Sequence, residues 1–164
     1  STAIKKDKAQ ASIIDEAVQT MSHLNQGAAK AMNAMDVNAC TDITGFGLLG
    51  HLREMCKASN VSANIEFNNL PLIKGAFELA QKGYVPGGTK RNLDFVSPDV
   101  NFSENISKEE KYLMADAQTS GGLLISVEKN KAETLQNLLS ENKCLASSII
   151  GQIKNPADIS IYVN

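Results

Sequence analysis

The sequence predicts an α+β domain, a two-layer structure in which helices pack on one face of a sheet. Segments with helical periodicity alternate with short strand-like segments, and some of these strands are adjacent along the chain. The 164 residues, 43% of them hydrophobic and 21% charged, are enough for one globular domain with its own core. These observations predict the fold class but no function.

The N-terminal half of the chain begins with helical patterns. Apolar residues at helical spacing within 7–35 predict an amphipathic helix, and Asn25 is expected to cap a second helical piece over 28–35. Gly27 is the expected break between the two. A strand at 39–43 then leads through a glycine turn into a helical pattern.

The rest of the chain alternates strands, helices and a long loop. Residues 84–107 contain Pro-Gly-Gly and a second proline, so they are predicted to be a loop in which 93–96 could form a short strand. Ser107 and Glu110 have the spacing of a capping box that begins a helix. The remaining predicted elements are a strand at 61–67, a helix at 72–82, a turn at 116–122, a strand at 123–127, a helix at 129–142 and strands at 147–153 and 159–163.

Composition excludes several classes of function. A net charge of −2 without a basic stripe argues against nucleic acid as a partner, and the absence of a long apolar run argues against a membrane span. The three cysteines, Cys40, Cys56 and Cys144, form no CxxC pair and are odd in number. We therefore expect free thiols in a reducing compartment, and a cytoplasmic protein.

The segment around Asp42 carries the most chemical information. A carboxylate at a strand end, followed by two glycines and a helix, stands beside a helix N-terminus, whose free N–H groups attract anions. Asp42 could bind Mg²⁺, which often takes one protein carboxylate together with phosphate oxygens and water. The alternative is that Asp42 and Thr44 only cap the helix. His51 is expected to be packed or hydrogen-bonded rather than catalytic.

Two further segments could bind or orient a ligand. Residues 87–92 read Gly-Gly-Thr-Lys-Arg-Asn, and two glycines followed by a hydroxyl and two cations could form an anion-binding turn. The polar turn at 116–122 could aim backbone N–H groups at a ligand. An ordinary solvated loop and a purely geometric turn are the respective alternatives.

Together these segments resemble the selenophosphate synthetase family. The motifs are ACTDITGFGLLGH (39–51), VPGGTKRN (85–92) and DAQTSGGLL (116–124). The resemblance implies the C-terminal domain, at 9–164, of an enzyme of the aminoimidazole ribonucleotide synthetase-like superfamily, with residues 1–8 as the remnant of a connector. Ala117 stands where the family commonly has proline.

The resemblance also implies the activity and its cofactors. Such an enzyme converts selenide, ATP and water to selenophosphate, AMP and phosphate, with ATP and Mg²⁺ held between two domains. Its reactive residue and most metal ligands lie upstream of Ser1, so no catalytic residue is expected here and this piece alone should be inactive. We expect the complete protein to be a homodimer.

At the level of residues, the resemblance assigns Asp42 as a metal ligand. The groups expected on the phosphate side are Thr44, Gly45, Gly47, Gly88, Thr89, Arg91 and Asn92. Two alternatives stay open at this point. One is another ATP-dependent enzyme of the superfamily, acting in purine biosynthesis or hydrogenase maturation, and the other is a non-catalytic binding domain.

Overall fold

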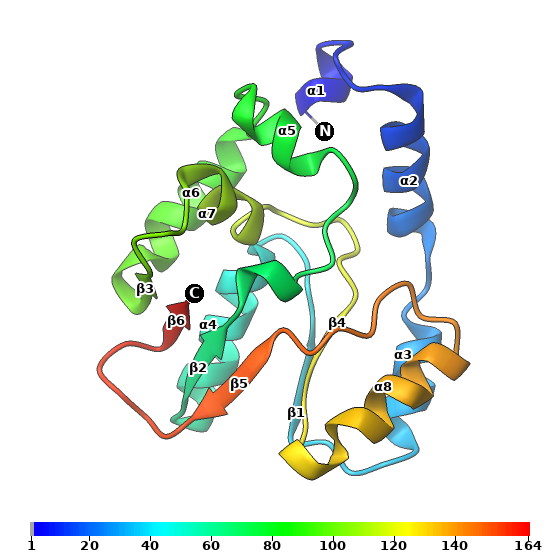
Figure 1. Ribbon diagram of the computed structural model, residues 1–164, viewed down its shortest axis with the longest axis vertical. Helices are drawn as coiled ribbons and strands as arrows, with labels where there is room; N and C mark the ends of the chain where they lie inside the picture. The colour runs from blue at the N-terminus through cyan, green and yellow to red at the C-terminus, as the bar shows by residue number, and fades with distance from the viewer. Residues whose placement is uncertain (1) are drawn as a thin grey trace.

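The computed structural model describes residues 2–164, and within them it confirms the α+β class (Figure 1). The strands are divided between a two-stranded sheet, in the order β1-β4, and a four-stranded sheet, in the order β3-β6-β2-β5. In the larger sheet β2 pairs antiparallel with β5 and parallel with β6, which also pairs parallel with β3. The strands are β1 (Ala39–Asp42), β2 (Ser62–Ile65), β3 (Val100–Phe102), β4 (Leu123–Ser126), β5 (Gly151–Lys154) and β6 (Ile161–Val163).

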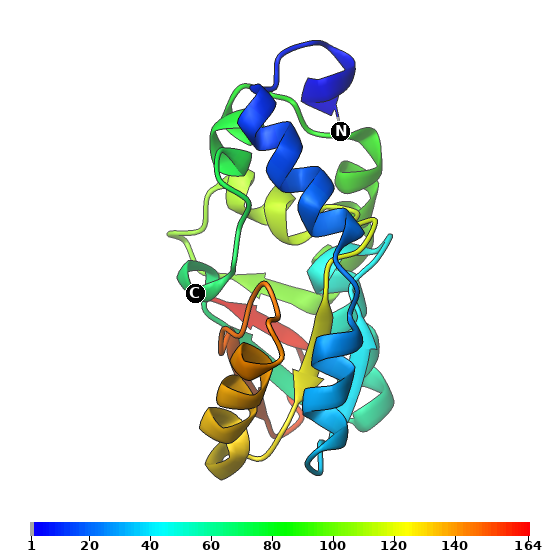
Figure 2. The same ribbon diagram turned by 90° about the vertical axis from the view of Figure 1, so that its right-hand side faces the viewer.

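Helices pack against the sheets and against one another. α4 packs on β2 and β6 of the larger sheet and also against α6, while α5 packs against α7. α3 packs against α8, and in Figure 2 this pair lies at the lower end of the molecule. The helices are α1 (Thr2–Lys5), α2 (Ala11–Ser22), α3 (Gln26–Asn33), α4 (Gly47–Ser59), α5 (Ala76–Gln81), α6 (Gly87–Val96), α7 (Lys108–Met114) and α8 (Ala132–Glu141), with 3₁₀ turns η1 (Phe67–Asn69), η2 (Ser97–Asp99) and η3 (Lys129–Lys131).

The core lies where α4, α6 and α7 cover the four-stranded sheet. Leu49 of α4 and Ile161 of β6 are fully buried, and Met114 at the end of α7 is nearly so. These side chains supply the burial that stabilises the fold. Along residues 2–164, no helix has the length and apolar character needed to cross a bilayer.

The predicted loop at 84–107 is wrong, because it contains a helix and a strand. Pro86 is the N-cap residue of α6, so the Pro-Gly-Gly signal marks the start of a helix rather than a loop. Residues 93–96, proposed as a strand, form the last turn of this helix, and Val96 on it is buried. β3 was missed because three residues are too few to show a period.

Three smaller predictions can also be compared with the structure. The capping box is confirmed, since the Ser107 N–H donates to Glu110 Oε2 at 2.6 Å and the Glu110 N–H donates to Ser107 Oγ at 3.3 Å. The helix predicted at 72–82 begins only at Ala76. Gly27 does not separate two helices but lies in α3, where a Cβ would come 2.5 Å from the Asn142 carbonyl oxygen. This glycine therefore permits close packing of α3 on the end of α8.

Candidate functional site

The three sequence motifs meet at one place in the fold, which we call the junction: residues 42–47, 86–92 and 115–122. The antiparallel β1–β4 pair brings two of them together, with Asp42 opposite Leu123. Beyond the strand the pairing continues, because the Ile43 N–H donates to the Gly122 carbonyl at 2.9 Å and the Gln118 N–H donates to the Thr44 carbonyl at 3.0 Å. The turn at 116–122 therefore lies directly against the loop that follows Asp42.

Asn92 joins the third motif to the other two. Its Nδ2 group donates to the Gly45 carbonyl at 2.9 Å and to the Ala115 carbonyl at 3.1 Å. One side chain on α6 thus bridges the loop after β1 and the end of α7. The amide hydrogens that the sequence suggested for a phosphate are engaged with backbone carbonyls instead.

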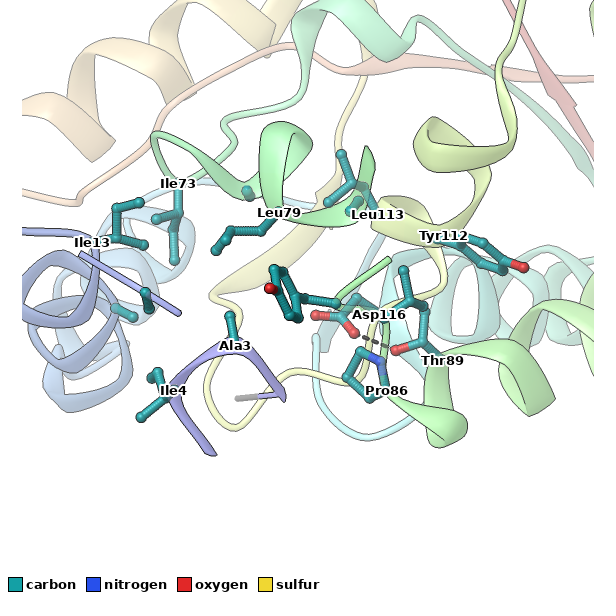
Figure 3. A pocket seen from close by; sticks show the side chains of 16 residues that line it. Ala3, Ile4, Ile13, Ile73, Leu79, Pro86, Thr89, Tyr112, Leu113 and Asp116 are labelled. Atoms are coloured by element: carbon teal, nitrogen blue, oxygen red, sulfur yellow. Dashed lines mark hydrogen bonds between the residues drawn. The ribbon is translucent and has the colours of Figure 1, made fainter. Parts of the chain in front are cut away.

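Thr89 and Asp116 form a second link. Thr89 is 1% exposed, and its hydroxyl donates to Asp116 Oδ1 (Figure 3). Burial raises the pKa of the Asp116 carboxyl, and the hydrogen bond from Thr89 acts in the opposite direction. The Thr89 hydroxyl thus points into the protein, and the expected place of Thr89 on the phosphate side stays a prediction that concerns its backbone N–H.

The predicted anion-binding turn is the first turn of α6. Its leading backbone N–H groups have no partner within the helix, and the positive end of the helix dipole lies there. Arg91 is exposed and folds back along this turn, since a Cβ on Gly87 would lie 3.5 Å from its Nη1 atom. The N-terminal end of α6, at Gly87 and Gly88, therefore combines free backbone N–H groups with the Arg91 guanidinium.

Asp42 is exposed at the last position of β1. In the part of the chain that the structure describes, no group of three or more His, Cys, Asp or Glu side chains could hold a metal ion. A single exposed carboxylate fits a Mg²⁺ ion whose other ligands are phosphate oxygens, water or residues outside this chain. Asp42 could supply one oxygen ligand to such an ion.

The loop after Asp42 is held by His51. Nε2 of His51 lies 3.1 Å from the Thr44 backbone nitrogen, which donates to it, and 3.1 Å from Thr44 Oγ1. His51 is thus hydrogen-bonded, as expected. The alternative that Asp42 and Thr44 cap α4 is not what forms, because the N-cap residue is Phe46 and no side chain caps this helix.

The two glycines of the loop differ. Gly45 is exposed, and a Cβ there would meet nothing within 4 Å, so its backbone is accessible to a ligand. Gly47 is buried with φ +69°, and a Cβ would lie 2.7 Å from the Ala115 carbonyl carbon. The structure therefore gives Gly47 a packing role, and its expected place on the phosphate side stays a prediction.

A pocket of about 160 Å³ lies beside the junction, between α1, α2, α5, α7 and the start of α6. Its lining is mainly apolar, including Ile13, Leu79 and Leu113, and Figure 3 places Asp116 and Thr89 together on its wall. Sequence reasoning missed the pocket and the partly buried Asp116. A carboxylate directly after the buried helix end was the available signal, but its partner lies 27 residues away.

Comparisons with known proteins place this geometry in context. The family described as "AIR synthase related protein, C-terminal domain" matches residues 3–164. Selenide, water dikinase of Clostridioides difficile is 45% identical over 153 residues, which cover 93% of this chain and 44% of that protein. Selenide, water dikinase of Aliarcobacter butzleri is 39% identical over 164 residues, covering 100% of this chain and 47% of that protein. The chain spans about half the length of these curated relatives.

A solved structure with the same fold is a chain in a crystal structure of a HypE–HypF complex. Its TM-score is 0.50 at 19% sequence identity, and the match covers 82% of this chain and 35% of that one. At this identity the likeness concerns the fold alone.

Proposed function

Because the chain belongs to the family of AIR synthase related C-terminal domains, we propose that it is the C-terminal domain of a selenide, water dikinase. The complete enzyme would convert selenide, ATP and water to selenophosphate, AMP and phosphate. The observation that carries the proposal is the convergence of three sequence-distant motifs at the junction, in a chain 39–45% identical to selenide, water dikinases.

The junction offers groups suited to phosphates. Asp42 would contribute one carboxylate to Mg²⁺, which when bound would neutralise phosphate charge during phosphoryl transfer. The N-terminal turn of α6, with Gly88 and the exposed Arg91, would attract phosphate oxygens. The accessible backbone of Gly45 would also face the phosphates.

The domain would work only with the rest of its enzyme. Residues 1–8 would be the connector and 9–164 the C-terminal domain, and the groups that react with selenide would lie in the other half. Phosphoryl transfer depends on several positioned charges, so one carboxylate and one helix end would not support turnover. We propose that the chain alone is inactive and that the complete protein is a homodimer. A cytoplasmic location would agree with its three free thiols.

The test is a selenide-dependent assay on the full-length protein, under anaerobic conditions with ATP and Mg²⁺. We expect phosphorus NMR to detect selenophosphate, and AMP to accumulate only when selenide is present. ATP consumption that is independent of selenide but requires a purine precursor or a carbamoyl compound would contradict the proposal and assign the chain to another enzyme of the superfamily.

A further inference from the structure

We propose that Thr89, Asn92 and Asp116 form a brace, a set of positioning residues that fixes the first turn of α6 against the loop carrying Asp42. The brace acts through the groups it holds and does not touch the ligand. Its effect on turnover rests on the proposed function, whereas its effect on the local structure does not.

Both α6 residues of the brace lie on the same face of the helix. Thr89 and Asn92 are three positions apart, so their side chains point the same way. Thr89 donates to Asp116, and Asn92 donates to the carbonyl of the preceding residue, Ala115. Two consecutive residues directly after α7 therefore anchor residues 89–92 of α6.

Asn92 extends the brace to the loop after β1. Its second bond goes to the Gly45 carbonyl, three residues beyond Asp42. An amide has two donor hydrogens, and here each is directed to a backbone carbonyl from a different segment. An ionised aspartate has the same shape but no donor, so it could make neither bond.

Ala115 is the point where the three segments meet without free space. It is 0% exposed, and its carbonyl carbon lies 2.7 Å from the position a Cβ would take on Gly47. Close packing of this kind transmits a displacement instead of absorbing it. A shift of α6 would therefore move its leading N–H groups and Arg91 relative to Asp42.

Such a shift should reduce catalysis more than it reduces stability. Misplacement of about 1 Å by a substitution away from the reacting atoms can lower a rate by roughly a hundredfold. The Thr89 hydroxyl is buried against Asp116 and Asn92 bonds only backbone carbonyls. A loss on changing either residue would therefore report positioning and not a lost ligand contact.

The experiment compares kcat/KM for ATP in the full-length protein, at a temperature well below every unfolding midpoint. We expect Thr89→Val and Asn92→Asp each to lose about tenfold or more, and Thr89→Ser, which keeps the hydroxyl, to recover most of the loss. If both act through the position of α6, the double variant should lose less than the product of the two single losses. Normal kcat/KM in Thr89→Val would overturn the brace.

Ser62→Ala is the matched control. Ser62 on β2 is also 1% exposed, and its hydroxyl donates to the Ile159 carbonyl and accepts from the Ala157 N–H, both in the segment between β5 and β6. This variant should lose stability to a comparable degree and keep its kcat/KM. An equal loss of kcat/KM in Ser62→Ala would mean that general destabilisation explains the data, which would also overturn the brace.

Hydrogen exchange separates the brace from the proposed function. In Asn92→Asp the amides of Thr44 and Gly47 should exchange faster than in the wild type, whatever reaction the protein catalyses. If the wild type has no selenide-dependent activity but these amides are released, the proposed function fails and the brace stands. If exchange at both amides is unchanged, the brace fails.

Discussion

The core of the four-stranded sheet and the junction hold the chain together in different ways. In the core, Leu49 and Ile161 are fully buried and contribute apolar surface. In the junction, Asn92 and Thr89 hold backbone and carboxylate acceptors through individual hydrogen bonds. The stability of the core therefore depends on the volume of its apolar side chains. The structure of the junction depends on hydrogen-bond donors at particular atoms.

Because of this difference, we expect the two regions to respond differently to substitution. Loss of volume in the core should lower the free energy of unfolding, because a cavity remains. Under the proposed function, loss of a charge or donor in the junction should lower turnover of the full-length protein, because phosphoryl transfer depends on placed charges. The predictions that follow test this separation of stability from catalysis.

The largest effect on stability is expected from Leu49→Ala. Leu49 is 0% exposed in the core, so the variant should lose about 2–5 kcal/mol of unfolding free energy, measured by urea denaturation of the chain. We expect the wild-type chain to unfold in one cooperative transition, which makes the measurement meaningful. The matched control is Leu145→Ala at a 53% exposed position, which should cost less than about 0.5 kcal/mol. Equal losses of unfolding free energy in the two variants would mean that Leu49 does not lie in the core.

The largest effect on catalysis is expected from Asp42→Asn in the full-length enzyme. The substitution keeps the size of the side chain but removes the charge proposed to hold Mg²⁺, so turnover should fall at least about a hundredfold. Stability should hardly change, because Asp42 is exposed at a strand end. Asp158→Asn, at an exposed position before β6, is the control and should retain full turnover. Near-normal turnover of Asp42→Asn at saturating Mg²⁺ would remove the metal role.

Gly47→Ala should lower the stability of the chain by an intermediate amount, for two reasons. The left-handed backbone at φ +69° and the close approach to Ala115 should together cost roughly 2–3 kcal/mol of unfolding free energy. Gly83→Ala separates the two causes, because Gly83 has φ +79° but open space around its Cβ position, and should cost only about 1 kcal/mol. Thermal unfolding of both variants checks the difference. If they lose the same stability, Ala115 does not restrict Gly47.

The sequence predicts those parts of the molecule that depend on local signals. The capping box at Ser107 and the strand, turn and helix around Asp42 follow from neighbouring residues, and both appear in the structure. α6 was missed because Pro86 and its two following glycines are equally typical of a loop. The burial of Thr89 and Val96, which involves residues distant in sequence, favours a helix there.

The roles within the junction depend on contacts that are distant in sequence. Asn92 bonds a carbonyl 47 residues away, and Thr89 bonds a carboxylate 27 residues away. A motif shows which residue types are present but not which direction a side chain faces. For this reason the sequence placed Thr89 and Asn92 on the phosphate side, and the structure places their donors on the protein.

The smallest predicted effect concerns two carboxylates with opposite pKa shifts. Hydrogen bonds from Lys57 and Arg53 lower the pKa of Asp99, whereas burial raises that of Asp116. Asp99 therefore stabilises the fold above its ordinary pKa of 3.8, and this is lost as the pH falls through its lowered value. The contribution of Asp116 is present below 3.8 and is lost as the pH rises through its raised value.

Unfolding free energies measured from about pH 7 to about pH 3 should separate these two groups. Asp99→Asn should cost about 0.5 kcal/mol near neutral pH, as partly exposed ion pairs do, and this cost should shrink toward acid pH. The stability of Asp116→Asn relative to the wild type should change in the opposite direction and become less favourable toward acid pH. At acid pH the wild-type carboxyl is neutral, so its burial no longer lowers the stability of the wild type. Parallel pH profiles for the two variants would contradict the raised pKa of Asp116 and its cause, the partial burial of this carboxyl.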